Sequence, residues 1–322
     1  LRTFGCRANH YDTQVVRALA ASAGCEIVDD VADADVAVFN SCAVTAEAER
    51  DVRKAVRQAA RRNGRLRSVV MGCASALPES RETLAALPAV SHLVSGADET
   101  AIMQALGIQA PTARGARQDT VRATLRIQDG CDEHCTFCAT TRARGANRSR
   151  SLDALVDEAA RLAEWHPEIV LSGTHIGTYG ADFGSSLGAL VERLVRDVPR
   201  ARFRLSSIEA TEVDERLMEL LADGAGRVAP HLHAPLQSGS DRILKRMGRH
   251  WYTASTYARS VERLAARAHV LGLGADIIVG FPGESDEDFL ATIALVERLP
   301  FTYLHVFPFS ARPGTAATRL AD

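Results

Sequence analysis

Residues 123–138, which read ATLRIQDGCDEHCTFC, decide the fold of this chain. Ala123–Gln128 is a short strand-like run, and a loop with Cys131, Cys135 and Cys138 follows it directly. Thiolate sulfur is the ligand that iron–sulfur clusters use. Three thiolates from one tight loop leave one iron of a four-iron cluster open to a small molecule that carries an amine and a carboxylate. The stretch therefore predicts such a cluster at the end of a strand.

Two other interpretations of this loop stay open. Zinc prefers four nitrogen or sulfur ligands in a closed structural site, but no Cys or His nearby in sequence completes the set, and His134 inside the loop is poorly spaced to share a metal. A thioredoxin-like redox pair at Cys135 and Cys138 would leave Cys131 without a role.

The chain downstream of this stretch alternates strands with helices, which predicts a partial (β/α)6 barrel. In such barrels the catalytic residues lie at the C-terminal ends of the strands. The strand candidates are Ala123–Gln128, Glu168–Ser172, Phe203–Ser207, His231–Pro235, Ala275–Gly280 and Tyr303–Phe309. The helical runs are Leu152–Trp165, Leu187–Val195, Glu215–Leu221 and Ala254–Leu271.

The chain upstream shows the same alternation on a smaller scale, which predicts an α/β domain with a parallel, Rossmann-like sheet. Its strand candidates are Leu1–Gly5, Ala34–Asn40, Leu66–Met71 and Ser91–Ser95, and its clearest helices are Asn9–Ala23 and Ala46–Arg62. Residues 109–119 are poor in apolar side chains and are typical of a linker. We therefore expect an N-terminal domain over residues 1–108 and a barrel domain over 120–322.

Three further cysteines, Cys6, Cys42 and Cys73, each follow an apolar strand candidate of the N-terminal domain. Parallel strands bring their C-terminal ends to one edge of the sheet, so we expect these thiols to converge. A helix follows each of them closely, and a helix N-terminus favours the thiolate. The pattern predicts a second cluster, again with three protein ligands. The alternative is that these cysteines are small apolar core residues.

Cys25 is different, because it precedes Glu26-Ile27-Val28, which we expect to be a strand. We expect Cys25 to be a structural core residue.

Composition excludes several classes of protein. No apolar run approaches the length of about 20 residues that crosses a bilayer, and no secretory signal opens the chain. Seven cysteines make an odd number, which favours cytoplasmic metal or redox chemistry over a disulfide framework. The net charge of −2 is not that of a typical nucleic-acid binder. Leu1 is not a Met, so we expect that a short N-terminal piece is missing.

The two cysteine sets and their order resemble the radical S-adenosylmethionine (SAM) methylthiotransferases over essentially the whole chain. Three segments look like that family's N-terminal domain: Gly5-Cys6-Arg7-x-Asn9, Asn40–Thr45 and Gly72-Cys73. Four segments look like its radical SAM domain: Leu171–Gly180, Arg204–Glu209, His231–Ser240 and Asp276–Glu284.

The segment after the second barrel strand separates the branches of this family. Residues 174–180 read Thr-His-Ile-Gly-Thr-Tyr-Gly, which resembles the branch that acts on threonylcarbamoyladenosine beside the tRNA anticodon. The alternatives are the branches that act on isopentenyladenosine in tRNA or on a ribosomal protein aspartate. An alternative from another class is an iron–sulfur electron-transfer or scaffold protein without catalysis.

Two features depart from the family pattern. Thr141 stands where the family usually has Pro, although Arg144 and Gly145 are retained. The family normally ends in a small RNA-binding TRAM domain, and this chain stops near the point where that domain would begin, so we expect it to be absent here.

The resemblance implies two 4Fe-4S clusters and SAM as cofactors, with Cys131, Cys135 and Cys138 holding one cluster and Cys6, Cys42 and Cys73 the other. Two SAM molecules would serve, one as methyl donor and one as the source of a 5′-deoxyadenosyl radical that abstracts hydrogen from C2 of the adenine. The expected SAM contacts are Phe137, Ser172, Gly173, Thr174, Glu209, Gln237, Ile278 and Gly280. The expected substrate contacts are His175, Tyr179 and Arg144.

The implied partners are the tRNA anticodon loop, whose unstacked bases are common targets of RNA recognition, and an electron donor such as flavodoxin or ferredoxin. No membrane partner and a cytoplasmic location are expected.

Overall fold

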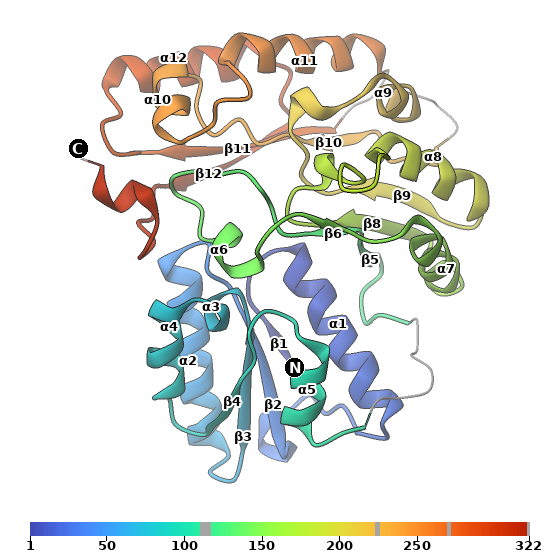
Figure 1. The fold of residues 1–322 in the computed structure, drawn as a ribbon, viewed down its shortest axis with the longest axis vertical. Helices are drawn as coiled ribbons and strands as arrows, with labels where there is room; N and C mark the ends of the chain where they lie inside the picture. Colours follow the sequence, from blue (N-terminus) through green and yellow to red (C-terminus); the bar gives the residue numbers. More distant parts are fainter. Residues whose placement is uncertain (110–116, 223–225, 269–271, 321–322) are drawn as a thin grey trace. The chain divides into compact units, whose positions relative to one another are not determined.

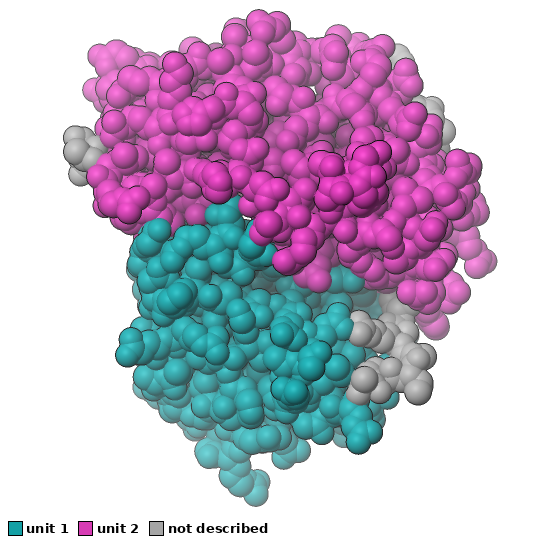
Figure 2. Space-filling view, viewed as in Figure 1, with its two compact units in different colours: residues 1–120, 139–145, 312–314 teal, residues 121–138, 146–311, 315–322 magenta. Residues whose placement is uncertain are grey.

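The computed structural model describes residues 1–109, 117–222, 226–268 and 272–320, and the chain divides into two units (Figures 1 and 2). Unit 1 contains residues 1–120, 139–145 and 312–314, and unit 2 contains 121–138, 146–311 and 315–322. Most of the predicted linker at 109–119, residues 110–116, lies outside the described residues. Two short segments far along the chain, 139–145 and 312–314, thus group with the N-terminal unit, which the expected boundaries did not include.

Unit 1 is built on a four-stranded, fully parallel sheet in the order β1-β2-β3-β4. Its strands are β1 Arg2–Thr3, β2 Val36–Ser41, β3 Arg67–Gly72 and β4 Val90–Leu93. Its helices are α1 Arg7–Ser22, α2 Ala46–Arg62, α3 Cys73–Ala76, α4 Pro78–Ala85, α5 Glu99–Leu106 and α6 Thr140–Arg144, with a 3-10 turn at Val31–Asp33. The predicted Rossmann-like parallel sheet is confirmed.

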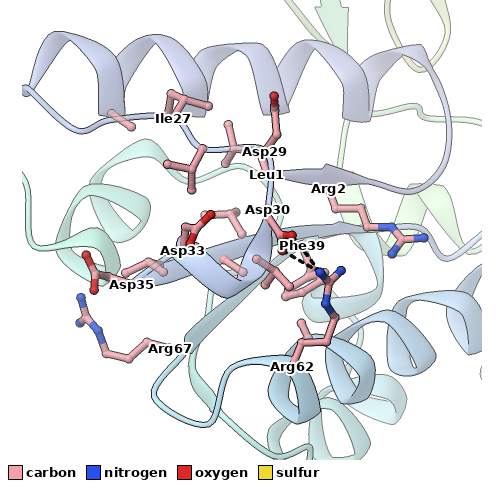
Figure 3. A pocket seen from close by; sticks show the side chains of 18 of the residues that line it. Leu1, Arg2, Ile27, Asp29, Asp30, Asp33, Asp35, Phe39, Arg62 and Arg67 are labelled. Atoms are coloured by element: carbon pink, nitrogen blue, oxygen red, sulfur yellow. Dashed lines mark hydrogen bonds and ion pairs between the residues drawn. The ribbon is translucent and has the colours of Figure 1, made fainter.

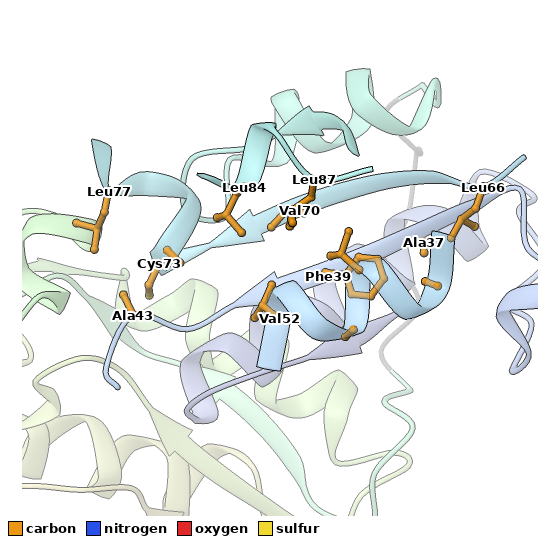
Figure 4. Packing of buried hydrophobic residues seen from close by; sticks show 14 of the residues in the cluster. Ala37, Phe39, Ala43, Val52, Leu66, Val70, Cys73, Leu77, Leu84 and Leu87 are labelled. Carbon is orange, nitrogen blue, oxygen red and sulfur yellow. The ribbon is translucent and has the colours of Figure 1, made fainter. Parts of the chain in front are cut away.

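Helices cover both faces of this sheet because its buried strands alternate their side chains between two cores. Phe39 and Val70 point into the core under α2 and α4, which Figure 4 shows from close by. Val38 and Val69, their direct neighbours in sequence, point into the core under α1 and α5. The apolar runs before Cys42 and Cys73 are therefore largely buried strands, whereas β1, before Cys6, is partly exposed.

Unit 2 forms the expected arc of six parallel strands. Three of them, β5 Ala123–Arg126, β8 Glu168–Ser172 and β9 Arg202–Leu205, make one sheet, and β10 His231–His233, β11 Gly272–Val279 and β12 Tyr303–Pro308 make another. A parallel bridge between Ser207 and His233 links the two sheets. A small antiparallel pair, β6 Gln128–Asp129 and β7 Arg148–Ser149, flanks the cysteine loop. The prediction of a partial (β/α)6 barrel is confirmed.

The helices of unit 2 follow its strands in turn. They are α7 Leu152–Leu162, α8 Leu187–Asp197, α9 Glu215–Ala222, α10 Asp241–Arg246, α11 Ala254–Arg267 and α12 Asp286–Arg298, with 3-10 turns at Ile176–Thr178, Ala210–Glu212 and Ala316–Arg319. Helix α11 was expected to run to Leu271, but it ends at Arg267, and residues 269–271 lie outside the described residues. Among the described helices, none is both long and apolar enough to cross a bilayer.

The prediction for Cys25 is wrong. The residue is exposed, and Glu26–Val28 form no strand. The segment connects α1 to the 3-10 turn at Val31–Asp33 without pairing to a strand of the sheet, and without ladder hydrogen bonds a short apolar run forms no strand. Cys25 is therefore not a core residue.

Candidate metal centres and active site

The N-terminal trio, which we define as Cys6, Cys42 and Cys73, stands at the carboxyl edge of the parallel sheet of unit 1. Cys6 is the N-cap residue of α1, Cys42 follows β2 directly, and Cys73 opens α3 after β3. Cys42 and Cys73 are buried, whereas Cys6 is exposed. The fold thus brings the three strand ends to one edge, as parallel strands require.

Asn9 lies between two members of this trio, Cys6 and Cys73. Its Oδ1 atom lies 3.5 Å from Cys6 Sγ and 3.9 Å from Cys73 Sγ. Its Nδ2 atom donates to Asn40 Oδ1 at 2.9 Å and to the Ser41 carbonyl at 2.8 Å, so the amide orientation is held from the β2 side. A fully buried asparagine with both ends satisfied is a rigid part of the site.

The side chain of Arg144 contacts the N-terminal trio. Arg144 lies in the segment of unit 1 that follows the central cysteine loop. Its Nε atom donates to Cys73 Sγ at 3.3 Å, and Nη2 donates to Asn9 Oδ1 at 3.1 Å and to Asp12 Oδ2 at 2.9 Å. The Arg144 and Asp12 side chains are only 5% and 1% exposed. A buried ion pair therefore fixes a cationic donor against one thiol.

Burial dominates the pKa of the two buried thiols, Cys42 and Cys73. It raises the pKa of Cys73 to about 12, and the charge of Arg144 only partly opposes this. Burial likewise raises the pKa of Cys42. For Cys42 and Cys73, desolvation therefore outweighs the effect that was expected from the helices that follow them. Metal binding must displace these protons.

The loop trio, which we define as Cys131, Cys135 and Cys138, lies in unit 2 beyond β6. Its loop is anchored by Thr136, whose backbone N–H donates to the Met247 carbonyl and whose hydroxyl donates to the Arg246 carbonyl, both at 2.8 Å. The Thr136 carbonyl accepts from Ala317 N at 2.8 Å. The three cysteines thus share one loop held at its centre.

A buried arginine contacts this trio as well. Arg249 Nη1 lies 3.6 Å from Cys135 Sγ, and the same guanidinium forms an ion pair with Glu209 and donates to the Tyr252 hydroxyl at 2.8 Å. Burial raises the pKa of Cys135 to about 12 against the opposing charge of Arg249. Each trio therefore has one thiol that faces a buried arginine, Cys73 being buried and Cys135 half-buried, and a buried carboxylate holds each arginine.

His175 contacts the first cysteine of the loop trio. Its Nδ1 atom lies 3.5 Å from Cys131 Sγ, and its Nε2 atom lies 2.8 Å from Glu212 Oε1. Burial lowers the pKa of His175, but its hydrogen bonds to Cys131 and Glu212 outweigh burial and raise that pKa to about 10. The ring is therefore a donor to the thiol.

The spacing of the sulfurs does not suit a single zinc ion. The ligands of one zinc ion lie within about twice the 2.3 Å Zn–S bond of one another. Among the described residues, only His233, Asp276 and His305 bring three ligand atoms within 4.8 Å of one another, so neither cysteine trio is that compact. Wider sets of three thiols suit a multi-iron cluster with one open corner.

The end of β8 carries one buried polar atom without a hydrogen-bond partner among the described residues. Ser172 is buried, and its Oγ has no hydrogen-bond partner among the described residues. A Cβ on Gly173 would come within 2.7 Å of Gln128 Oε1, so only glycine fits there. Thr174 donates from its backbone N–H to Gln128 Oε1 at 3.0 Å and from Oγ1 to Asp129 Oδ1 at 3.2 Å. This turn is tightly built, and it leaves one buried hydroxyl for a ligand.

Glu209 supplies a second buried atom of this kind. Its Oε2 atom has no hydrogen-bond partner among the described residues, although Glu209 pairs with Arg249. Burial raises the pKa of Glu209 despite the arginine. A buried acceptor without a donor is costly, so this atom is suited to a ligand hydroxyl or amine.

The other expected SAM contacts lie along β10–β12. Gln237 has a positive φ of 65°, which is unusual for a non-glycine residue, and its carbonyl accepts from Ile278 N at 2.9 Å. Phe137 and Ile278 both pack against one apolar cluster with Phe281. Gly280 has open space around its Cα and donates to Glu284 Oε2 at 2.5 Å.

All three expected substrate contacts, Tyr179, Arg144 and His175, already have partners within the structure. Tyr179 is 1% exposed, and its hydroxyl donates to the Arg150 carbonyl at 2.9 Å, so it supports the loop from inside. Arg144 is committed to Cys73 and Asp12. His175 is buried against Cys131 and Glu212 rather than free at a loop surface. Each side chain already has its partner in the interior.

Sequence reasoning assigned no role to Asp12, Arg249 and Glu212, which complete these networks. Asn9 was part of a motif that resembles the family, but no contact was predicted for its side chain. Asn9 and Asp12 lie three residues apart on one face of α1, and this spacing could have paired them. Nothing local to Arg249 indicates Cys135 as its neighbour, because they come from distant parts of the chain.

A pocket of about 910 Å³ lies elsewhere in unit 1 (Figure 3). It is lined by the amino ends of β2 and β3 and by the segment that follows α1. In it Arg62 Nη2 lies 2.9 Å from both carboxylate oxygens of Asp30. Because the cysteines stand at the carboxyl ends of the same strands, this pocket is at the opposite edge of the sheet from the N-terminal trio.

Comparison with known proteins gives family matches in both units. A model described as the radical SAM superfamily matches residues 125–296, and one described as the uncharacterized protein family UPF0004 matches residues 1–96. The threonylcarbamoyladenosine tRNA methylthiotransferase MtaB of Thermotoga maritima is 35% identical across 99% of this chain and 76% of its own length. The tRNA-2-methylthio-N(6)-dimethylallyladenosine synthase of Staphylococcus epidermidis is 29% identical across 100% of this chain and 67% of its own.

A solved structure supports the fold. The radical SAM methyltransferase TsrM from Kitasatospora setae, with cobalamin and a 4Fe-4S cluster bound, superimposes with a TM-score of 0.63 at 16% identity. The match covers 89% of this chain and 64% of that protein.

The chain is a radical SAM enzyme, a class that uses a 4Fe-4S cluster and SAM. Its partial barrel of six parallel strands carries three cysteines on the loop after β5 and β6, as this class does. The similarity to MtaB extends over both units. This chain belongs to the MtaB-type methylthiotransferases of the radical SAM superfamily, and the resemblance found in its motifs is confirmed.

Proposed function

We propose that this chain transfers a methylthio group to C2 of N6-threonylcarbamoyladenosine next to the anticodon of tRNA. The observation that carries the proposal is the presence of two separate cysteine trios, each with one thiol facing a buried arginine that is held by a carboxylate. The relative named for this activity, at 35% identity, supports the substrate.

In this proposal the loop trio holds the 4Fe-4S cluster that cleaves SAM, and the N-terminal trio holds a second 4Fe-4S cluster. Three thiol donors in each set, with no fourth, fit two clusters that each keep one iron open. When bound, the clusters and two SAM molecules supply a 5′-deoxyadenosyl radical, a methyl group and the sulfur atom that is transferred.

The residues around the loop trio position SAM. The buried Ser172 hydroxyl and the Glu209 Oε2 atom have no partner among the described residues, which supports their assignment as contacts for polar groups of SAM. Gly173 and Thr174 form the turn that follows Ser172. The strained backbone at Gln237 supports a contact with SAM from the β10–β11 side. Phe137, Ile278 and Gly280 remain our proposed neighbours of the adenine.

Around the N-terminal trio, the chain's own residues orient thiols rather than substrate. Arg144 and Asn9 share one hydrogen-bonded network with Cys73 and Cys6. Hydrogen bonds to cluster sulfurs are among the factors that set a cluster's reduction potential. We therefore assign Arg144 to the second cluster and not to RNA.

The proposed partners follow from this reaction. The macromolecular substrate is the anticodon loop of tRNA, and reduction of the loop cluster needs a low-potential donor such as flavodoxin or ferredoxin. A tRNA substrate implies a cytoplasmic location.

A second branch of the family remains the main competitor. The relative named for dimethylallyladenosine is 29% identical to this chain, compared with 35% for the relative named for threonylcarbamoyladenosine. The segment Thr174–Gly180 also favours the threonylcarbamoyl branch.

The experiment is a single-turnover assay on the anaerobically reconstituted chain. It receives SAM, dithionite and an anticodon stem-loop RNA that carries threonylcarbamoyladenosine, and the digested nucleosides are analysed by mass spectrometry. We expect the 2-methylthio product and 5′-deoxyadenosine together. A matched RNA with isopentenyladenosine should stay unmodified.

Three other results would reassign the chain. Product on the isopentenyl RNA alone would assign it to the competing tRNA branch. Cleavage of SAM with neither RNA modified would favour a protein substrate. A chain with intact clusters that releases no 5′-deoxyadenosine would be an electron-transfer or scaffold protein.

A further inference from the structure

Three neighbouring strands of unit 2, β10–β12, carry a polar surface whose side chains have no role in the reaction proposed above. The register pairs His233 with Gly274, Gly274 with Tyr303, and Asp276 with His305, so these side chains project from one face of the sheet. The alternate positions on β11, Leu273 and Ala275, are buried on the other face, which helices α11 and α12 cover (Figure 1). The polar face is therefore the inner face of the partial barrel.

Hydrogen bonds join these residues into one array, which we call the inner-face array (His231, His233, Asp276, Tyr303 and His305). Asp276 Oδ1 lies 2.9 Å from His233 Nε2 and 3.2 Å from His305 Nδ1. The Tyr303 hydroxyl lies 2.8 Å from His231 Nε2 and 3.0 Å from His233 Nδ1. The array offers both donors and acceptors at one place.

Glycine makes this arrangement possible. A Cβ on Gly274 would overlap the ring of Tyr303, so a side chain there would push the tyrosine away from His231 and His233. The absence of a side chain lets the Tyr303 ring stack against both imidazoles, with ring centroids 5.9 and 5.6 Å away.

The array continues into an exposed aromatic surface. His305 is 55% exposed, and its ring lies 6.3 Å from that of Phe307, which is 41% exposed and projects from the same face two residues further along β12. The two ring planes are inclined at 76° to each other, and the exposed face of a single aromatic ring is what an unstacked base uses for stacking in RNA recognition. Polar groups next to such a surface can bind a substituent on the base.

We infer that the inner-face array binds the polar N6 substituent of the modified adenosine, with Phe307 and His305 receiving the base. This inference rests on the proposed function. The substituent carries a carboxylate, a hydroxyl and a urea-like carbonyl and N–H groups, which imidazole, phenol and carboxylate side chains match. An isopentenyl group has none of these, so the array would leave its own polar groups unpaired against that substrate.

A divalent cation is the competing occupant, because two histidines and one carboxylate are a known metal-ligand set. The exposed aromatic continuation of the array and its place on the inner face favour the nucleoside. The experiment below therefore also measures whether the chain binds a divalent cation.

The test measures binding without turnover. Equilibrium affinities of the cluster-loaded chain are determined for stem-loop RNAs that carry either threonylcarbamoyladenosine or unmodified adenosine. The variants are His305→Phe, which keeps a ring but removes both nitrogens, and Tyr303→Phe, which removes one hydroxyl. We expect the wild-type chain to prefer the threonylcarbamoyl RNA and each variant to lose about 10- to 100-fold of that preference, as hydrogen bonds to a charged group would.

The matched control is Val306→Phe, an exposed residue on the opposite face of the same strand. It should keep the full preference. Iron content and release of 5′-deoxyadenosine without RNA report that each variant is folded and loaded. Tyr303→Phe removes a single oxygen and therefore tests the array even if the histidine variant fails to fold.

The inference and the proposed function fail in different ways. If the wild-type chain forms no methylthio product on threonylcarbamoyl RNA, the proposed function is wrong. If it forms product but both variants keep the wild-type preference, the inner-face array does not bind the substituent. Stoichiometric zinc or manganese bound by the wild-type chain in addition to its iron, and lost in His305→Phe, would make the array a cation site and overturn the inference.

Discussion

Arg144 is the residue whose substitution most directly tests the second cluster. We expect Arg144→Gln to lower the free energy of unfolding by about 3–5 kcal/mol, because the buried carboxylate of Asp12 would lose its ion pair with the guanidinium. The bound iron should fall from about eight atoms per chain toward about four, since Cys73 loses its donor. Urea titration followed by circular dichroism, together with iron analysis, measures both effects.

The matched control for this prediction is Arg142→Gln on the same short helix. Arg142 pairs with Glu79 at 2.5 Å, but both side chains are about one-third exposed. A pair of that exposure contributes less than about 1 kcal/mol. If the two variants lose the same stability and Arg144→Gln keeps all its iron, Arg144 has no special role at the trio.

Glu209 makes a different prediction at the same scale. Glu209→Gln keeps the shape of the side chain and removes the charge that faces Arg249, and its free oxygen is the proposed SAM contact. We expect SAM affinity, measured by calorimetric titration of the anaerobic protein, to fall by about tenfold or more. The iron bound by the loop trio should not change, and unaltered SAM affinity would remove Glu209 from the SAM site.

At the scale of elements, helix α12 starts at a capping box in which Ser285 is the N-cap residue and Asp288 is its partner in the first turn. Asp288 Oδ2 accepts from Ser285 N at 3.0 Å, and Asp288 Oδ1 accepts from Ser240 Oγ at 2.5 Å, so the residue caps α12 and joins it to the start of α10. Hydrogen bonding to Arg242 is the largest of the effects that hold the pKa of Asp288 well below its ordinary range.

This geometry predicts a pH-dependent difference between the wild type and Asp288→Asn. A carboxyl whose pKa is lower in the folded chain stabilises above its ordinary pKa of about 4, and that stabilisation is lost as the pH falls through its folded value. We expect the variant to be about 1–2 kcal/mol less stable at pH 7 and the gap to shrink below about pH 4. Asp286→Asn, exposed in the same first turn, is the control, and a gap independent of pH would contradict the prediction.

Elements with strong periodic patterns were predictable from the sequence. Helix α2 and strand β8 have the expected bounds, because an uninterrupted amphipathic run and a short apolar run each have one way to bury their side chains. Glu26–Val28 was misassigned because three residues carry no period. The convergence of the strand-end cysteines followed from parallel topology, whereas their arginine partners did not.

Those partners depend on packing that no local pattern encodes. Arg144 follows the loop trio in sequence but lies with the N-terminal trio in unit 1, so its sequence neighbours suggested an RNA contact that the structure does not favour. Tyr179 was expected to contact the substrate because it lies on a loop after a barrel strand. Its burial depends on the tertiary position of Ser149–Arg150.

At the scale of the whole molecule, the two trios belong to different units and should be separable by mutation. Replacing Cys6, Cys42 and Cys73 together by Ala should leave about four iron atoms per chain and preserve release of 5′-deoxyadenosine, because the loop trio and its SAM contacts lie in unit 2. The same variant should form no methylthio product, since the proposed source of sulfur is gone. Iron analysis and nucleoside mass spectrometry measure these results.

The converse variant, with Cys131, Cys135 and Cys138 replaced by Ala, should also keep about four iron atoms but release no 5′-deoxyadenosine. The pair of variants tests the division of labour, because each should lose one cluster and a different product. If the N-terminal variant still bound about eight iron atoms, the second cluster would have other ligands. If it bound four but still methylthiolated RNA, the transferred sulfur would come from elsewhere, and the role of Arg144 at Cys73 would be structural alone.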